Sequence, residues 1–390
     1  MAAATSHWQR RGYSVAAMRD LARARVPRPI FEFLDGGAED ERTLRRNEDG
    51  FGDIDFVPHP LTGVGPRDLS VELFGKRLEL PLVIAPTGLS GLYWPDGERC
   101  AARAAAGAGA GFCLSHASIC SMEELAGTKA SPRWMQVFVY RDRTLTRHFV
   151  ERAAAAGYDA LVLTVDSQLI GNRERDIRNG FTNPPHFSLG ELIAMIPQAP
   201  WLWRMRRELR GVNLGNYTHA GEVTDLYTAA DKLPALLDPT MSWADVDLLR
   251  SWWKGPLIVK GVLDPAEANE AVARGVDGIV VSNHGGRQLD GALASIDALP
   301  AIAERVAGRI PILLDSGVRR GSDVVKAMAL GASACLIGRP HLYGLTIAGE
   351  AGVSHVLEIF RREIDRVIGL CGVATMAGVT PSLVRRAAHR

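Results

Sequence analysis

The chain has 390 residues, of which 47% are hydrophobic, and its 45 basic and 44 acidic residues leave a formal net charge of +1. This length allows a large buried core, and the balanced charge excludes the basic surface typical of a nucleic-acid-binding protein. The five cysteines form no CxxC pair and no metal-ligand spacing, so we expect no metal site and a reducing, cytoplasmic location rather than a disulfide-stabilised secreted fold.

Residues 1–80 are expected to form a helical wrap or lid rather than an independent domain. They contain a turn-like Asp-Gly-Gly at 35–37 and a Pro-rich irregular stretch at 58–66. The first residues mix Arg, Gln and His without an apolar core, so we expect no signal peptide. No apolar stretch approaches the roughly 20 residues that a membrane-spanning helix needs.

Apolar runs of strand length recur through the rest of the chain, and most are followed by a segment of helical composition. Near-continuous apolar strands are typical of a parallel sheet that is buried on both faces. We expect eight such strands, at 81–85, 111–114, 134–139, 160–165, 256–260, 278–281, 311–315 and 334–338.

The segments between these runs are predicted to be helices, and several precede a glycine at which a helix would stop. Strands alternating with helices are typical of a (β/α)8 TIM barrel, and the alternative is a doubly wound open sheet. We expect the barrel at 81–375, with a long insertion after the fourth strand at about 183–250 and a C-terminal tail at 376–390. The predicted helices lie at 98–109, 142–156, 265–274, 292–306 and 322–330.

The residues at the ends of the eight runs favour the barrel over the open sheet. In a barrel the carboxyl ends of all strands meet at one face, and the chemistry takes place there. Every end carries a small, polar or ionisable residue: Thr87, Ser115, Gln136 with Phe138, Thr164 with Asp166, Lys260, Ser282 with His284, Asp315, and Gly338 with Arg339.

The most informative end is that of the sixth run, where an apolar strand meets Ser-Asn-His-Gly-Gly-Arg-Gln at 282–288. Histidine is the side chain whose ordinary pKa lies nearest neutrality, so His284 suits proton abstraction. The guanidinium of Arg287 can grip a carboxylate with two parallel hydrogen bonds. A base and an anion clamp at one strand end indicate an enzyme that acts on a small organic acid. The alternative is a polar loop with a satisfied histidine.

The last two runs end in glycine-rich turns that open helices, at 315–322 and 338–340. Backbone N–H groups at a helix N-terminus form an anion site together with the helix dipole and a nearby arginine, and barrels often bind phosphate after strands 7 and 8. No Walker A motif is present, and no GxGxxG follows the first strand. We therefore expect a phosphorylated cofactor on a barrel rather than NAD on a Rossmann fold. The alternative is two ordinary turns with surface arginines.

Several sequence blocks resemble the FMN-dependent α-hydroxy-acid oxidase and dehydrogenase family, which includes glycolate oxidase, flavin L-lactate dehydrogenase and (S)-mandelate dehydrogenase. The resemblance extends from about residue 13 to 385, and it is nearest to the bacterial dehydrogenases at 86–95 and 172–176. The His-Gly-Gly-Arg block is highly specific to the family. The strongest blocks lie at 36–40, 84–88, 164–166, 282–288 and 315–321.

This resemblance implies FMN as the cofactor and a role for each matching residue. His284 would be the catalytic base, Asp166 would stabilise its protonated form, and Lys260 would lie beside the flavin N1/O2 edge. Arg287 and Arg173 would hold the substrate carboxylate. Contacts to the flavin ring or ribityl chain are implied for Ala85, Pro86, Thr87, Ser115, Gln136, Thr164 and Ser282, and contacts to ribityl and phosphate for Asp315, Gly317, Arg319, Gly338 and Arg339.

Some substrate-site positions depart from the family pattern. Phe33 and Phe138 stand where the family has tyrosines that bind the substrate carboxylate and α-hydroxyl, and each lost hydrogen bond is worth roughly 1.5–3 kcal/mol. We do not expect Tyr140, two residues further on, to replace the missing hydroxyl. Ala117 stands where glycolate oxidase has a bulky aromatic residue, which enlarges the pocket. Gly88 stands where family oxidases often have alanine, which favours a dehydrogenase.

Residues 189–210 of the insertion combine apolar residues and tryptophans with clustered arginines, the composition of an interfacial membrane segment. The related bacterial dehydrogenases associate with membranes through this loop, so the resemblance implies peripheral contact with the inner face of the cell membrane. The alternatives are a mobile active-site lid and a subunit contact.

The predicted function is FMN-dependent oxidation of a bulky or aromatic, mandelate-like 2-hydroxy acid to the 2-oxo acid. The expected electron acceptor is a quinone, a cytochrome or O2, and the expected assembly is a homotetramer. Hydride transfer and a carbanion route both remain open. One alternative is the same flavin chemistry on an ester, amine or peptide-derived substrate, and another is a non-catalytic flavin-binding barrel.

Overall fold

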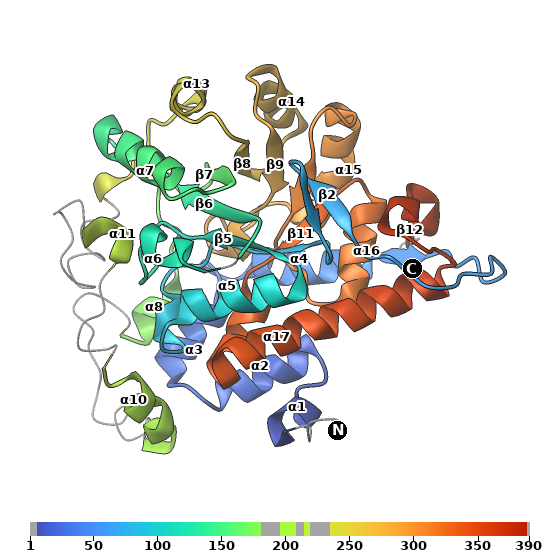
Figure 1. Cartoon of the computed structure of the whole chain (residues 1–390), viewed down its shortest axis with the longest axis horizontal. Coiled ribbons are helices and arrows are strands. Elements are labelled where there is room, and N and C mark those ends of the chain that lie inside the picture. Colours follow the sequence, from blue (N-terminus) through green and yellow to red (C-terminus); the bar gives the residue numbers. More distant parts are fainter. Residues whose placement is uncertain (1–5, 129, 181–195, 208–213, 219–234, 388–390) are drawn as a thin grey trace.

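The computed structural model describes residues 6–128, 130–180, 196–207, 214–218 and 235–387. Eight parallel strands close into a barrel, and the helices that connect them surround it (Figure 1). The predicted (β/α)8 barrel is therefore confirmed. Each strand falls on one of the eight apolar runs: β4 (Leu82–Ile84), β5 (Gly111–Leu114), β6 (Arg133–Val137), β7 (Ala160–Thr164), β8 (Leu257–Val262), β9 (Gly278–Val281), β10 (Ile312–Leu314) and β11 (Ala334–Ile337).

The strands are mostly apolar because both of their faces are buried. Val83, Val162 and Val280 belong to a cluster that fills the barrel interior. Their neighbours Leu82 and Leu163 belong to the larger cluster between the strands and the surrounding helices. Successive side chains of a strand point to opposite faces, so a strand buried on both sides carries no polar alternation.

The five predicted helices are confirmed to within about three residues at each end. The final helix, α17, has 32 residues and packs against α5 and α2 (Figure 1). It bends at Ala348 and Gly349, where a Cβ on Gly349 would lie 2.5 Å from the Trp94 indole nitrogen. The helices that follow the strands are α5 (Gly97–Ala108), α6 (Met122–Ala126), α7 (Arg143–Ala155), α13 (Trp243–Trp252), α14 (Pro265–Ala273), α15 (Ser295–Val306), α16 (Gly321–Ala329) and α17 (Arg339–Leu370).

The N-terminal segment is helical only in part. A hairpin of two short strands closes the amino-terminal end of the barrel, where Phe74 at its tip makes an edge contact with Trp134, at 5.8 Å between ring centroids. A further short strand pairs with one near the C-terminus, so the C-terminal residues lie against the N-terminal segment at 54–56. This segment contains α1 (His7–Arg11), α2 (Val15–Arg23), α3 (Arg28–Asp35), α4 (Arg42–Gly52), β1 (Ile54–Phe56), β2 (Val71–Leu73) and β3 (Lys76–Leu78), and β1 pairs with β12 (Val384–Arg386).

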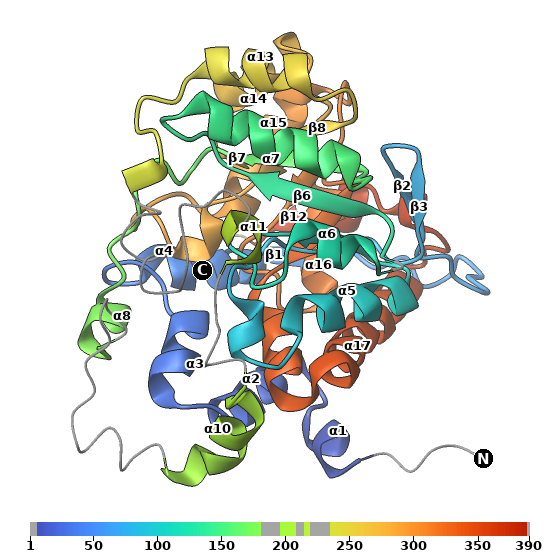
Figure 2. The same ribbon diagram turned by 60° about the vertical axis from the view of Figure 1, so that its left-hand side comes forward.

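The region between β7 and β8 contains the expected insertion, of which 181–195, 208–213 and 219–234 lie outside the described residues. α13 takes the place of the barrel helix after β7, so the expected insertion overlaps an ordinary barrel element. Figure 2 shows α10 at the end of the molecule that also holds α2 and α3. Among the described residues, no helix has the length and apolarity needed to cross a membrane. The short helices here are α8 (Glu174–Arg178), α10 (Ala199–Met205) and α11 (Gly215–Thr218).

Candidate active site

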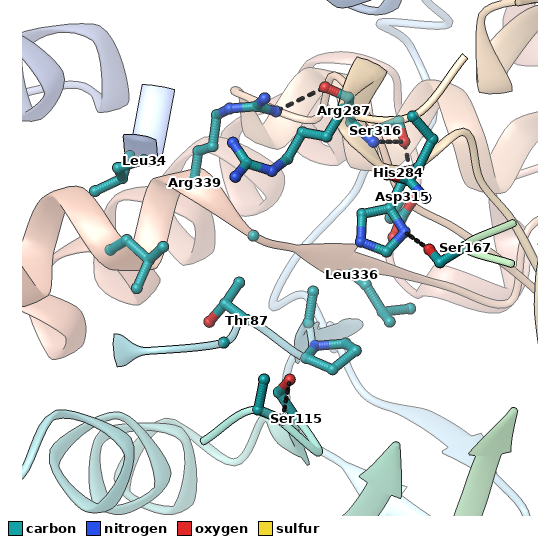
Figure 3. A pocket seen from close by; sticks show the side chains of 18 of the residues that line it. Leu34, Thr87, Ser115, Ser167, His284, Arg287, Asp315, Ser316, Leu336 and Arg339 are labelled. Atoms are coloured by element: carbon teal, nitrogen blue, oxygen red, sulfur yellow. Dashed lines mark hydrogen bonds between the residues drawn. The ribbon is translucent and has the colours of Figure 1, made fainter. Parts of the chain in front are cut away.

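A cavity of about 340 Å³ opens at the carboxyl ends of the strands, and Figure 3 shows its wall from close by. His284 and Arg287 lie on one side, with Thr87 and Ser115 across from them. Residues from α3 complete the wall, so the N-terminal segment helps to build the site. The predicted site residues in this wall are Phe33, Ala85, Pro86, Thr87, Ser115, Ala117, Phe138, Arg173, Lys260, His284, Arg287, Asp315, Gly317, Arg319, Gly338 and Arg339.

Four predicted site residues do not line the cavity, and three of them, Gln136, Asp166 and Ser282, bond to residues that do. The hydroxyl of Ser282 accepts hydrogen bonds from the backbone N–H of His284 at 3.1 Å and from Lys260 Nζ at 2.9 Å. Thr164 is the buried last residue of β7. Gln136 lies within hydrogen-bond distance of the His116 ring, and Asp166 lies within hydrogen-bond distance of the His284 ring.

His284 begins a short 3-10 turn, η4 (His284–Gly286), and has a left-handed backbone with φ 59°. Its Nδ1 lies 3.0 Å from Oδ1 of Asp166, so the other ring nitrogen is left for chemistry. Burial raises the pKa of the Asp166 carboxyl, but the nearby His284 and Lys260 outweigh burial and leave that pKa below its ordinary value. An ionised Asp166 fixes the ring orientation of His284 and stabilises its protonated form.

Lys260 is buried at the end of β8, with Nζ 3.1 Å from a carboxylate oxygen of Asp315. Burial alone would lower the pKa of Lys260, but the charges of Asp315 and Asp166 raise it above its ordinary value. Lys260 is therefore a cation at neutral pH. It supplies a fixed positive charge on the cavity wall.

Arg173, Arg287 and Arg339 form a cluster of cations on the cavity wall, in which Arg339 is buried and Arg173 and Arg287 are half-buried. Arg287 donates to the carbonyl oxygens of Phe33 and Gly36 at 2.8 and 2.9 Å, so its bonds are to neutral groups. Arg339 likewise donates to the carbonyl oxygens of Gly285 and Gly36 at 2.9 and 2.8 Å.

Burial and mutual repulsion act on the pKa values of this cluster. Burial and the charge of Arg173 lower the pKa of Arg287 to about 10, and burial and the charge of Arg287 lower that of Arg339 to about 10. Both guanidinium groups stay charged at pH 7. Asp176 lies 3.9 Å from Arg173, and burial raises the pKa of its carboxyl. An anion that entered this cavity would therefore be strongly favoured.

The two helix N-termini near the cavity differ in their availability to a phosphate. At α16 the backbone N–H groups of Arg319 and Arg320 both donate to Asp323 at 2.8 Å, and that of Gly321 donates to Glu363 at 2.8 Å. At α17 no side chain caps the N-terminus, and Gly338 and Arg339 face the cavity. The expected anion site is therefore confined to the turn after β10 and the start of α17.

The residues present fit FMN. Ala85, Pro86 and Leu336 give the cavity an apolar side, and Lys260 lies on its wall. A Cβ on Gly338 would meet nothing closer than a Thr87 methyl at 3.8 Å, so this turn leaves room for a bound group. Several buried donors find no partner among the described residues and would be satisfied by an oxygen-rich ligand. They are Gln136 Nε2, Arg173 Nε and Arg339 Nε.

Sequence reasoning missed several polar residues of the wall, among them Tyr93 and His116. Tyr93 is 1% exposed, and the charges of Arg287 and Arg173 act on its phenol. It lies within the block at 86–95, but nothing in its local sequence shows that it turns toward the arginines. Tyr140, by contrast, pairs its hydroxyl with that of Tyr217 at 2.5 Å and does not line the cavity, as expected.

Comparison with known proteins agrees with this geometry. The family model described as FMN-dependent dehydrogenase matches residues 22–386. The chain is 42% identical to the L-lactate dehydrogenase of Alcaligenes faecalis over 94% of this chain and 97% of that protein. It is 43% identical to the L-lactate dehydrogenase of Caulobacter vibrioides (strain NA1000 / CB15N) over 95% of this chain and 97% of that protein.

Solved structures show the same likeness. The crystal structure of the monotopic membrane protein (S)-mandelate dehydrogenase superposes with a TM-score of 0.92 at 38% identity, covering 96% of this chain and 99% of that one. A mandelate oxidase superposes with a TM-score of 0.83 at 34% identity, covering 97% of this chain and 99% of that one. The family match at 22–386 includes the barrel, the arginines of the cavity wall and the His284 loop. The chain therefore belongs to the FMN-dependent dehydrogenase family and is an FMN-dependent 2-hydroxy-acid dehydrogenase.

Proposed function

We propose that this enzyme oxidises an aromatic or similarly bulky 2-hydroxy acid to its 2-oxo acid. The observation that carries the proposal is the arrangement of one cavity. A carboxylate-oriented histidine shares the cavity wall with Arg287, which donates to neutral backbone carbonyls, and much of the remaining wall is aromatic and apolar. Such a cavity accepts a small anion together with an apolar side chain.

His284 is proposed as the group that takes the proton. Its Nδ1 is held by Asp166, so its other ring nitrogen receives a proton from the substrate and the ionised carboxylate stabilises the resulting cation. Arg287 and Arg173 orient the substrate carboxylate. Bound FMN supplies the two-electron acceptor, and Lys260 supplies positive charge to the wall around it. These residues are compatible with hydride transfer and with a carbanion route.

The bulk of the preferred side chain follows from the apolar part of the wall, which includes the Phe33 ring, 5.3 Å from the Arg287 guanidinium. Phe33 and Phe138 offer rings without hydrogen-bond donors, and Ala117 leaves space beside them. A short side chain such as that of lactate would leave this apolar surface uncovered, whereas a phenyl ring would bury it. Tyr93 is proposed to supply the carboxylate with the phenolic donor that Phe33 lacks.

An ester, amine or peptide-derived substrate is the alternative that Phe33 and Phe138 favour. The arginines of the cavity wall favour a carboxylate instead, because a neutral substrate would leave their charges uncompensated. Anaerobic bleaching of the flavin absorbance decides between the two. We expect (S)-mandelate to bleach it faster than lactate does, and methyl mandelate to react slowly. Fast bleaching by lactate or glycolate with none by mandelate would refute the proposal.

We propose a quinone-type acceptor for the electrons rather than O2. The supporting observation is Gly88, where a Cβ would lie 3.1 Å from the Cβ of Ala117 and 3.3 Å from its carbonyl oxygen. An alanine at this position would press on the wall beside the substrate, so the glycine keeps that wall open. Rates of reoxidation by O2 and by a soluble quinone, measured on the reduced enzyme, test the proposal. Faster reoxidation by air than by quinone would contradict it.

We also propose that α10 contacts a membrane surface. Trp201 and Met205 are buried and hold the helix to the body, whereas Trp203 is 69% and Leu202 39% exposed. Arg206 lies over the Trp203 ring at 4.0 Å, which places a cation beside exposed apolar surface. Parts of the expected segment, 189–195 and 208–210, lie outside the described residues.

Sedimentation with anionic phospholipid vesicles tests this contact. The wild type should sediment with the vesicles, and a variant with Leu202→Ser and Trp203→Ser should stay in solution. Leu61→Ser serves as the matched control, because Leu61 is fully exposed on a different part of the chain. A wild type that remains in the supernatant would show that the exposed residues serve another purpose.

A further inference from the structure

His116 is a polar residue of the cavity wall to which the proposed chemistry gives no role. It follows β5 and precedes Ala117, the residue that enlarges the side-chain pocket. Its ring makes an edge contact with Phe138, at 4.2 Å between centroids and 68° between planes, and the residue is only 9% exposed. A buried imidazole therefore borders the space in which the aromatic side chain of the substrate is proposed to lie.

The hydrogen bonds of Gln136 determine which nitrogen of His116 carries a proton. The backbone N–H of His116 donates to Gln136 Oε1 at 3.1 Å, which identifies that atom as the carbonyl oxygen of the amide. The same oxygen lies 2.8 Å from His116 Nδ1. Because a carbonyl oxygen only accepts, Nδ1 must be the protonated nitrogen.

The second nitrogen is then a hydrogen-bond acceptor. Burial lowers the pKa of His116 to about 4, and the charge of His284 acts in the same direction, so the ring is neutral at pH 7. A neutral ring with a proton on Nδ1 has a lone pair on Nε2. No hydrogen-bond donor to His116 Nε2 is found among the described residues, although the ring lines the cavity.

We infer that His116 Nε2 accepts a hydrogen bond from the side chain of the substrate, and that the preferred substrates are aromatic 2-hydroxy acids with a hydroxyl group on the ring. This inference rests on the proposed function and deepens it. The donor belongs on the ring, because the arginines face the carboxylate and His284 faces the reacting carbon. An apolar pocket with one oriented acceptor discriminates between rings that can and cannot donate.

The holoenzyme tests the inference with (S)-mandelate, its 3- and 4-hydroxy derivatives and 4-methoxymandelate, which can accept but not donate. One hydroxymandelate should show a kcat/KM about 3- to 10-fold above that of mandelate and of the methoxy compound, the range of one hydrogen bond between neutral groups. The preference should vanish in His116→Asn, which keeps a donor to Gln136 and loses the distal acceptor. It should persist in His116→Gln, whose side-chain oxygen can reach the position of Nε2.

A binding measurement separates this inference from the proposed function. The 2-oxo acid products, phenylglyoxylate and its hydroxy derivatives, can be titrated into oxidised holoenzyme and followed through the flavin absorbance. Tighter binding of a hydroxylated product to the wild type and not to His116→Asn supports the inference without turnover. Equal affinities in the wild type, or a preference that survives His116→Asn, would overturn it. If no mandelate is oxidised while lactate is, the proposed function fails, and the binding comparison still decides the role of His116.

Discussion

The side-chain amides of Asn47 and Asn283 form a reciprocal pair: Asn47 Nδ2 donates to Asn283 Oδ1 at 2.9 Å, and Asn283 Nδ2 donates to Asn47 Oδ1 at 2.7 Å. Asn47 lies on α4, and Asn283 immediately precedes His284. Both are buried, and Asn283 also accepts from the backbone N–H of Gly286 at 3.1 Å. The N-terminal segment thus supports the loop that carries the proposed base.

Asn47→Ala is expected to lower the free energy of unfolding by about 1–3 kcal/mol, because it removes two buried hydrogen bonds to Asn283. It should also lower kcat, since the loop around His284 loses a support. Urea unfolding and steady-state turnover measure the two effects. Asn269→Ala on α14 is the control and should change neither by much, because its side chain pairs with a surface arginine. Unchanged turnover in Asn47→Ala would show that the loop holds its shape without the pair.

Tyr93→Phe is expected to raise KM for a carboxylate substrate by about 10- to 100-fold and to leave the reaction of the methyl ester unchanged. The phenol lies among the arginines, so its loss removes a hydrogen bond to a charged group, worth roughly 1.5–3 kcal/mol. Steady-state kinetics on the acid and its ester provide the measurement. Tyr13→Phe, at a 75% exposed position, is the matched control. Equal changes for acid and ester would indicate a packing role.

Phe138→Tyr is expected to raise kcat/KM for small hydroxy acids such as lactate by about 10-fold. The new hydroxyl would restore a donor near the α-hydroxyl and fill part of the apolar space. Activity on mandelate should change less, because its ring already covers that wall. The ratio of kcat/KM for mandelate to that for lactate is therefore the quantity to measure. A ratio that rises in the variant would contradict the assignment of Phe138 to the substrate wall.

Acidification is expected to destabilise the protein through two buried neutral rings, His116 and His341. Burial lowers the pKa of each to about 4, whereas histidine in an unfolded chain has a pKa of about 6.5. Between these values the unfolded chain binds more protons, so stability is present at neutral pH and is lost as pH falls from about 6.5 toward 4.

Each ring should remove about 2 kcal/mol of stability between pH 7 and pH 5. His341→Gln should therefore reduce the loss between these two pH values by about that amount in urea unfolding. His148→Gln on the exposed face of α7 is the control and should leave the loss unchanged. A pH dependence that His341→Gln leaves unaltered would mean that other groups dominate the acid response.

The elements that the sequence predicted correctly are those with a local cause. Apolar runs such as 278–281 must be strands buried on both faces, and glycines such as Gly275 follow the ends of helices. The β2–β3 hairpin and the β1–β12 pair were not predicted, because their strands have three residues each and their partners are set by packing at the end of the barrel.

The candidate site likewise contains features that have a local cause in the sequence and features that depend on the packing of distant segments. The sequence by itself determined that a histidine, an arginine and glycine-rich turns stand at strand ends, because strand direction and loop chemistry are local properties. Only the tertiary structure decided that Asp323 already caps α16, that Tyr93 joins the arginines, and that His116 lines the cavity with its Nδ1 beside Gln136. These depend on contacts between residues far apart in the chain and on burial, which sets the charge of each group and has no signature in the neighbouring sequence.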